Sequence, residues 1–102
     1  MIRHIVLIRF REDVAEATIA AIFEEIGAIR DRIPGFIDMR GGRSESPEGI
    51  ERGYMHGFTV DFEDWEALAA YQAHPDHKAA GAKLVANADG GIDGILVLDL
   101  EV

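Results

Sequence analysis

The sequence has 102 residues, 48% of them hydrophobic and 28% charged, which is the composition of one globular domain. Nineteen acidic residues against ten basic ones give a formal net charge of −9, and because this charge repels polyphosphate we expect no nucleic-acid partner. The absence of cysteine excludes disulfides and thiolate nucleophiles, and without any stretch near the ~18 apolar residues of a membrane span we expect a cytoplasmic protein with no membrane segment.

Strand and helix periodicities follow one another in the first half of the chain. Apolar residues alternate along residues 2–10, which predicts a strand. Asp13 followed three residues later by Glu16 indicates a capping box, and apolar residues recur at helical spacing behind it, so we predict a helix over about 14–32. A second, weaker strand is predicted over residues 36–43.

The second half contains a strand, a broken helix and a final strand. A polar turn cluster at 44–49 predicts a hairpin loop, and alternation over 54–62 predicts the third strand. A short helix over 65–72 meets Pro75, which fits the first turn of a further helix, so we predict a kinked second helix. Residues 92–102 predict the last strand.

This order of elements is the βαββαβ pattern of a ferredoxin-like α+β fold. We expect one domain with a four-stranded antiparallel sheet, the first and third strands in the centre, and the helices on one face. The other face should be polar in a monomer, yet it carries several apolar residues: Ile5, Leu7, Met55, Leu96, Leu98 and Leu100. Burying about five such side chains is worth on the order of 10 kcal/mol per subunit as an upper estimate, so we predict a twofold homodimer with the sheets face to face.

Two histidines lie on otherwise apolar strand faces. His4 shares its face with Val6 and Ile8, and His56 shares its face with Phe58. If these faces look toward the helices, both imidazoles project from adjacent central strands and could meet in one cavity. A buried imidazole needs a hydrogen-bond partner, so the alternative is a pair of satisfied core histidines.

Tyr71 and His77 flank the proline break, which lets a phenol and an imidazole converge. A tyrosine hydroxyl can hold a carbonyl or enolate oxygen, and an imidazole can move a proton near neutral pH. The alternative is that Tyr71 is a core aromatic residue and that His74 and His77 only cap a helix. The i, i+3 spacing of these histidines lacks the usual zinc-helix pattern, and we expect neither a metal nor a cofactor.

The chain resembles the stress-responsive A/B barrel (Dabb) family over essentially its whole length. The residues that carry the resemblance are Met1-Ile2-Arg3-His4-Ile5-Val6-Leu7, Ile33-Pro34-Gly35, Gly53-Tyr54, Asp61-Phe62, Tyr71, His74-Pro75-Asp76-His77 and Leu98-Asp99. The resemblance implies one Dabb domain over residues 1–102 and a dimeric α/β barrel built from two ferredoxin-like subunits.

A plant branch of that family cyclises linear polyketides by cofactor-free aldol chemistry. The resemblance implies that His77 is a general base assisted by Tyr71, and that His4 and His56 line the substrate pocket. The apolar walls it implies are Val6, Ile8, Phe23, Ile26, Phe58 and Val97. Small residues at Ala79-Ala80-Gly81 replace the bulky aromatic residues of the cyclases. The alternative function is a non-enzymatic, stress-responsive protein that binds a small organic ligand.

Overall fold

Strict alternation of buried and less buried residues places β1 (Ile2–Ile8) and β3 (His56–Phe62) in the centre of the sheet. The computed structural model describes residues 1–102 and contains one antiparallel sheet of four strands in the order β2-β3-β1-β4. The edges are β2 (Phe36–Arg43) and β4 (Ile95–Glu101), which alternate less clearly because each has a single strand neighbour. The predicted ferredoxin-like topology is confirmed.

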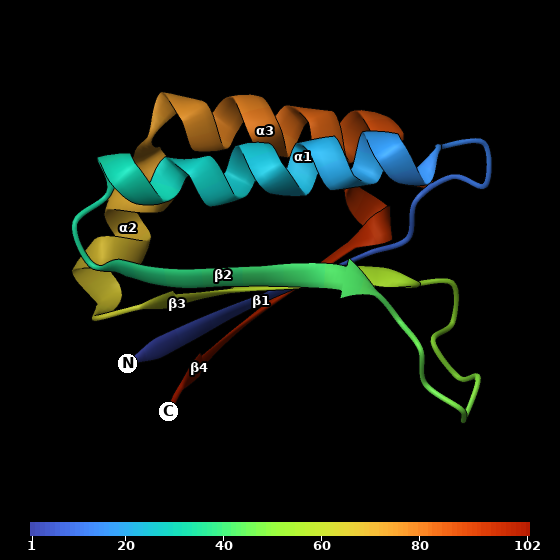
Figure 1. The fold of residues 1–102 in the computed structure, drawn as a ribbon, viewed down its shortest axis with the longest axis horizontal. Helices are drawn as coiled ribbons and strands as arrows, with labels where there is room; N and C mark the ends of the chain where they lie inside the picture. The colour runs from blue at the N-terminus through green and yellow to red at the C-terminus, as the bar shows by residue number, and fades with distance from the viewer.

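The helices cover one face of this sheet (Figure 1). They are α1 (Glu16–Ala28), α2 (Trp65–Ala73) and α3 (Pro75–Asn87), with short 3-10 turns η1 (Ile29–Arg32) and η2 (Gly91–Gly94). The predicted kink is a full break between α2 and α3. None of the helices has the length and apolar character needed to cross a bilayer.

Several boundary predictions are wrong. β1 ends at Ile8 rather than residue 10, and β3 begins at His56 rather than residue 54. The helix predicted over 14–32 is α1 followed by the 3-10 turn η1. The capping box at Asp13 and Glu16 is absent: α1 begins at Glu16 after Ala15, which provides no side-chain cap, and Glu16 binds side chains of the sheet instead. The last strand begins at Ile95 rather than residue 92, because Gly90 adopts a left-handed conformation with φ 80° and leads into η2.

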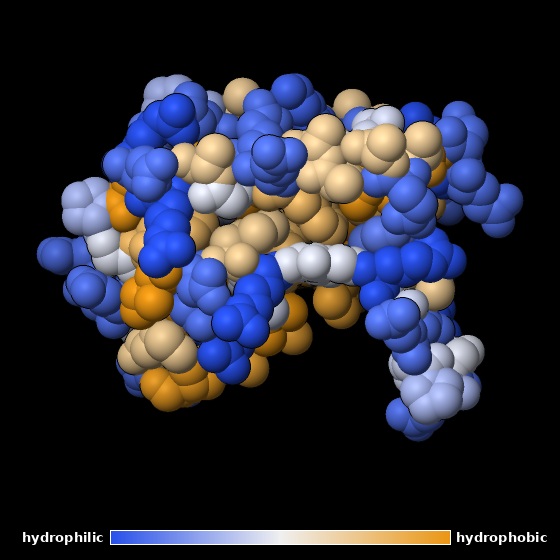
Figure 2. Space-filling view, in the orientation of Figure 1, coloured by the Kyte–Doolittle hydropathy of each residue, from blue (hydrophilic) through white to orange (hydrophobic).

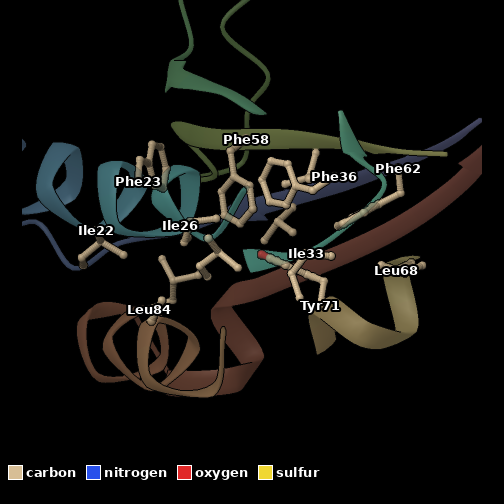
Figure 3. Packing of buried hydrophobic residues seen from close by; sticks show 14 of the residues in the cluster. Ile22, Phe23, Ile26, Ile33, Phe36, Phe58, Phe62, Leu68, Tyr71 and Leu84 are labelled. Carbon is tan, nitrogen blue, oxygen red and sulfur yellow. The ribbon is translucent and has the colours of Figure 1, made fainter. Parts of the chain in front are cut away.

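One hydrophobic cluster fills the space between sheet and helices (Figure 3). Its aromatic rings meet at tilted or edge-to-face angles: Phe36 with Phe62 at 5.4 Å, and Phe23 with Phe58 at 5.3 Å between centroids. Tyr71 joins the first pair, 5.1 Å from Phe62. The aromatic layer therefore extends from the sheet up to α2.

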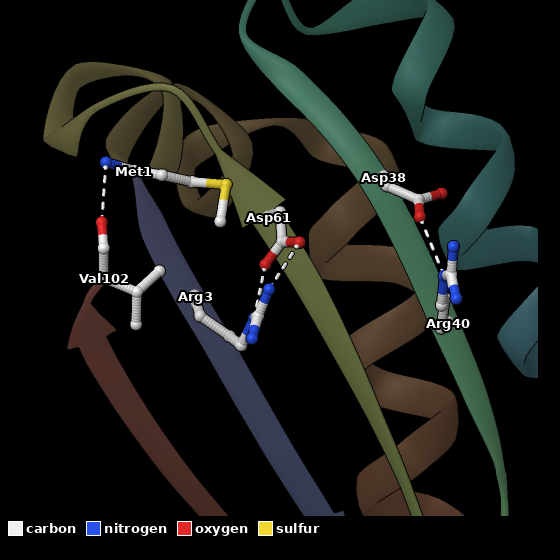
Figure 4. A network of polar contacts seen from close by, with 6 residues as sticks. All are labelled: Met1, Arg3, Asp38, Arg40, Asp61 and Val102. Atoms are coloured by element: carbon white, nitrogen blue, oxygen red, sulfur yellow. Dashed lines mark hydrogen bonds and ion pairs between the residues drawn. The ribbon is translucent and has the colours of Figure 1, made fainter.

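The outer face of the sheet, opposite the helices, has an apolar half and a polar half. The apolar half lies on β1 and β4, where Leu98 is 56% exposed between two further exposed leucines, and Figure 2 shows apolar residues along this lower side of the molecule. The polar half lies on β2, on β3 and at the start of β1, and it includes the ion pairs Arg3–Asp61 and Arg40–Asp38 (Figure 4).

Candidate active site

The corner between α2 and α3 brings Tyr71 and His77 together. Asp64 caps α2 by accepting a hydrogen bond from the Ala67 N–H at 2.9 Å, and the helix ends at His74, whose extended backbone turns the chain before Pro75 starts α3. After this turn the Tyr71 and His77 ring centroids are 4.4 Å apart. The predicted convergence of phenol and imidazole is confirmed.

Tyr71 is 1% exposed and lies among the aromatic residues of the core. In Figure 3 its hydroxyl oxygen points into the apolar cluster, away from α2. Burial alone raises the pKa of Tyr71, with no hydrogen bond and no charged neighbour contributing. The phenol is therefore neutral at physiological pH and can act as a hydrogen-bond donor.

His77 is half-buried and has a defined tautomer. Its Nδ1 lies 3.2 Å from the Gln72 carbonyl oxygen, which can only accept, so Nδ1 carries the proton and Nε2 keeps a lone pair. Burial lowers the pKa of His77, the charges of His4 and Lys78 act in the same direction, and the Gln72 carbonyl opposes them. A neutral imidazole with a free Nε2 is suited to accept a proton.

We expect His77 to titrate below its ordinary pKa of 6.5 in the folded protein. Because the unfolded chain then takes up this proton first, the stability contributed by neutral His77 is complete above about pH 6.5 and is lost as the pH falls below that value. A histidine-detected NMR titration, assigned with His77→Gln, measures the midpoint directly. A midpoint at or above the ordinary value would contradict this description of the site.

His4 is buried beside Tyr71, with 5.9 Å between the ring centroids. Its Nδ1 donates to the Asp99 carboxylate at 2.6 Å, which fixes the orientation of the ring. Sequence analysis did not identify Asp99 as a partner. Strand alternation places Asp99 on the inner face of β4 with Ile95 and Val97, and the register between β4 and β1 places it opposite His4.

His56 belongs to a separate cluster at the other end of the sheet. Its Nε2 contacts both carboxylate oxygens of Glu16, at 2.9 and 3.0 Å, and Arg43 binds the same carboxylate. The hydrogen bond from His56 is the main cause that lowers the pKa of Glu16. This cluster borders an open cleft of about 910 Å³ that also contacts Phe10.

The common cavity that we expected for both strand histidines is not present. His4 pairs with Val60 and His56 with Ile8, so the two residues lie four positions apart along the strands, or about 13 Å. The large cleft is lined by His56 but not by His4. Each imidazole instead has its own carboxylate partner.

The predicted apolar walls form packed core rather than an enclosed pocket. Five of them are buried in the hydrophobic cluster: Val6, Ile8, Phe23, Ile26 and Phe58. None of the four main pockets is lined by these residues, by Tyr71 or by His77. Val97 faces the helical side but is 52% exposed, because β4 is the edge strand. Their roles in ligand binding remain predictions.

The histidines do not assemble a metal centre. No group of three or more His, Cys, Asp or Glu side chains is arranged to hold an ion. His74 and His77 point their Nδ1 atoms to different backbone groups, the Asp76 N–H and the Gln72 carbonyl. The functional side chains that the structure gathers near the α2–α3 corner are His4, Tyr71, His77 and Asp99.

Comparison with known families matches the whole domain. The model described as Stress responsive A/B Barrel Domain aligns with residues 2–102. The Arabidopsis thaliana stress-response A/B barrel domain-containing protein HS1 is 29% identical over 96% of this chain and 86% of its own. Olivetolic acid cyclase from Cannabis sativa is 28% identical over 78% of this chain and 79% of its own.

A solved structure is similar to this chain along its whole length. It is a dimeric ferredoxin-like protein of unknown function from Jannaschia sp. CCS1, with a TM-score of 0.91 and 36% sequence identity. The alignment covers 99% of this chain and 98% of that one. The arrangement of β1 to β4 with the three helices on one face is thus shared along the full chain.

Proposed function

Because the chain belongs to the stress-responsive A/B barrel domain family, we propose that it is a homodimer that binds a small organic carbonyl compound and moves a proton on it without a cofactor. The proton-transfer site is the set His4, Tyr71, His77 and Asp99, called here the corner site. The similarity to olivetolic acid cyclase supports an enzyme that acts on an oxygen-rich organic molecule.

The contact between Tyr71 and His77 is the observation that carries this proposal. One side chain is a neutral phenol that lacks a hydrogen-bond partner, and the other is a neutral imidazole whose Nε2 is an acceptor. A base and a hydrogen-bond donor, here on rings whose centroids lie 4.4 Å apart, are the two groups needed to form an enolate.

In the proposed step, His77 Nε2 accepts a proton from the carbon next to the substrate carbonyl. The electron pair of that C–H bond moves onto the carbonyl oxygen, where the Tyr71 hydroxyl donates a hydrogen bond to the enolate. Return of a proton from the imidazolium to the same carbon regenerates His77. Attack of the enolate on a second carbonyl of the same molecule, followed by protonation of the new alkoxide by the imidazolium, gives the aldol outcome.

The exposed side chains of the edge strand β4 leave a route by which a ligand can approach the corner site. Val97 is open to solvent on the helical side, and Asp99 beside it is partly exposed. An added Cβ at Gly81 on α3 would meet no atom within 4 Å, so this part of the helix surface is also open. We propose that the ligand lies along this strip and reaches His77 from the side of Val97.

The packed core favours one second candidate, a stress-responsive protein that binds an organic ligand without turnover. Its supporting observation is the close packing around the Tyr71 hydroxyl, which leaves none of the main pockets beside it. In that case the corner site would only recognise a carbonyl oxygen.

The homodimer is proposed through the outer face of the sheet. The Jannaschia relative is dimeric, and the exposed leucines of β4 lie beside Ile5 and Leu7 of β1 on the same face. Contiguous apolar surface of this kind marks an interaction site. We also propose a cytoplasmic location and no nucleic-acid partner, because the net charge of −9 repels polyphosphate.

Proton exchange separates the two candidate functions. We expect the wild-type protein to accelerate deuterium incorporation next to the carbonyl of 2-pentanone and of the triketone 2,4,6-heptanetrione in D₂O, followed by ¹H NMR. Saturation-transfer NMR on the same samples reports binding. Binding without accelerated exchange would replace the enzymatic proposal by the ligand-binding one. If the protein neither binds these ketones nor accelerates their exchange, both candidate functions are rejected for this class of compound.

A further inference from the structure

We propose that His74 is a positioning residue that holds His77 against Tyr71, because its imidazole caps α3 as a hydrogen-bond acceptor. The consequence for catalysis rests on the proposed function, whereas the capping role does not. Sequence analysis raised capping by both histidines as an alternative to chemistry. The structure assigns the cap to His74 alone and leaves the His77 ring for the corner site.

The cap is defined by one hydrogen bond. The Asp76 backbone N–H donates to His74 Nδ1 at 3.0 Å. Since a backbone N–H can only donate, Nδ1 must carry a lone pair, and the proton of the neutral ring lies on Nε2. His74 has the extended conformation of an N-cap residue, with ψ 137°. Pro75 has no N–H, so the Asp76 N–H is the first donor of α3 that needs a partner.

The backbone of His74 joins the two helices. Its N–H donates to the Tyr71 carbonyl at 3.1 Å, which closes α2, and its carbonyl accepts from the Lys78 N–H at 3.1 Å, which starts α3. Tyr71 lies three residues before His74 and His77 three residues after it. Loss of the cap lets the first turn of α3 fray, and His77 lies in that turn.

The other restraints on this turn are weaker. Arg32 of η1 forms an ion pair with Asp76 at 3.3 Å, but both side chains are about half exposed. Exposed pairs contribute little to stability. The Asp76 carboxylate also lies 3.8 Å from His74 Nδ1, beyond hydrogen-bond distance. A further restraint is the bond from His77 Nδ1 to the Gln72 carbonyl, which itself requires the turn to be in place. The His74 cap is therefore the contact that decides where His77 lies.

Three variants test this role in the full-length protein. His74→Ala removes the acceptor, and His74→Asn keeps a good N-cap acceptor. Arg32→Ala is a matched control that removes the ion pair with Asp76 and a hydrogen bond to the Ala28 carbonyl but leaves the cap in place. The primary readout is histidine NMR of His77, which reports its tautomer and its titration midpoint without any substrate.

In His74→Ala we expect the His77 midpoint to rise toward 6.5 and the Nδ1–H tautomer to lose its dominance, because the fraying turn exposes the ring. His74→Asn and Arg32→Ala should keep the wild-type tautomer and midpoint. If the exchange activity is present, His74→Ala should lower its rate constant by about tenfold to a hundredfold, and His74→Asn should restore it.

An unchanged His77 tautomer and midpoint in His74→Ala would overturn the positioning role. So would failure of His74→Asn to match the wild type. If His74→Ala does not fold, His74→Gln carries the same comparison, because its longer amide is a poor cap. Absence of exchange activity in the wild type would reject the proposed enzymatic function. The capping role of His74 would still be tested by the NMR measurements on His77, which need no substrate.

Discussion

The variant His77→Ala is expected to lower the rate constant for α-proton exchange by about 10²–10⁴-fold, the usual contribution of a positioned general base. The reason is specific: Nε2 is the nitrogen of His77 left with a lone pair, and burial keeps the ring neutral. The exchange assay in D₂O measures the effect. Binding of the ketone should change much less, because the remaining surface at β4 is intact.

Tyr71→Phe should produce a comparable loss of about 10²–10³-fold, since it removes the donor to the enolate oxygen. The ring itself stays, so its packing against Phe36 and Phe62 is preserved. Tyr54→Phe is the matched control, because it also removes one hydroxyl, at a half-exposed position that contacts the Asp93 carbonyl. The corner site would be excluded as the source of catalysis if either His77→Ala or Tyr71→Phe kept an exchange rate constant within about twofold of the wild-type value.

The second large effect is expected at the outer face of the sheet. Leu98→Glu places a carboxylate in the apolar half, twice in each dimer. Burial of one leucine is worth about 1.5–3 kcal/mol, so losing two raises the dissociation constant by roughly 10²–10⁴-fold before the cost of the charge is added. Sedimentation velocity at micromolar concentration should show a folded monomer.

Arg40→Glu is the control for this experiment, because it changes charge on the polar half of the same face, where Arg40 pairs with Asp38. It should dimerise much more tightly than Leu98→Glu. Circular dichroism checks that both variants are folded. A stable Leu98→Glu dimer would show that the two subunits meet elsewhere or that the face has another partner.

Much of the fold follows from periodicity in the sequence. The period-two pattern around His4 and His56 predicted the central strands, and both are buried on the helical side as expected. The pattern gave wrong element boundaries where contacts with distant residues or a special backbone conformation override the local sequence preference. Glu16 looked like a capping residue, but its carboxylate is taken by His56 and Arg43, and left-handed Gly90 delays the last strand.

The part of the candidate site formed by residues close together in the sequence was predictable. Tyr71 and His77 meet because Pro75 breaks the helix between them. The separation of His4 from His56 was not predictable, because it depends on the register between β1 and β3, which strand alternation alone does not define. Asp99 was missed for the same reason: only the pairing of β4 with β1 places it opposite His4.

The most direct test compares two pH curves measured on the same wild-type protein. If His77 is the base, the rate constant for α-proton exchange should rise with pH and level off, with a midpoint equal to the His77 midpoint seen by NMR and below 6.5. A rate that rises through a different midpoint, or that does not change while His77 titrates, would contradict the account.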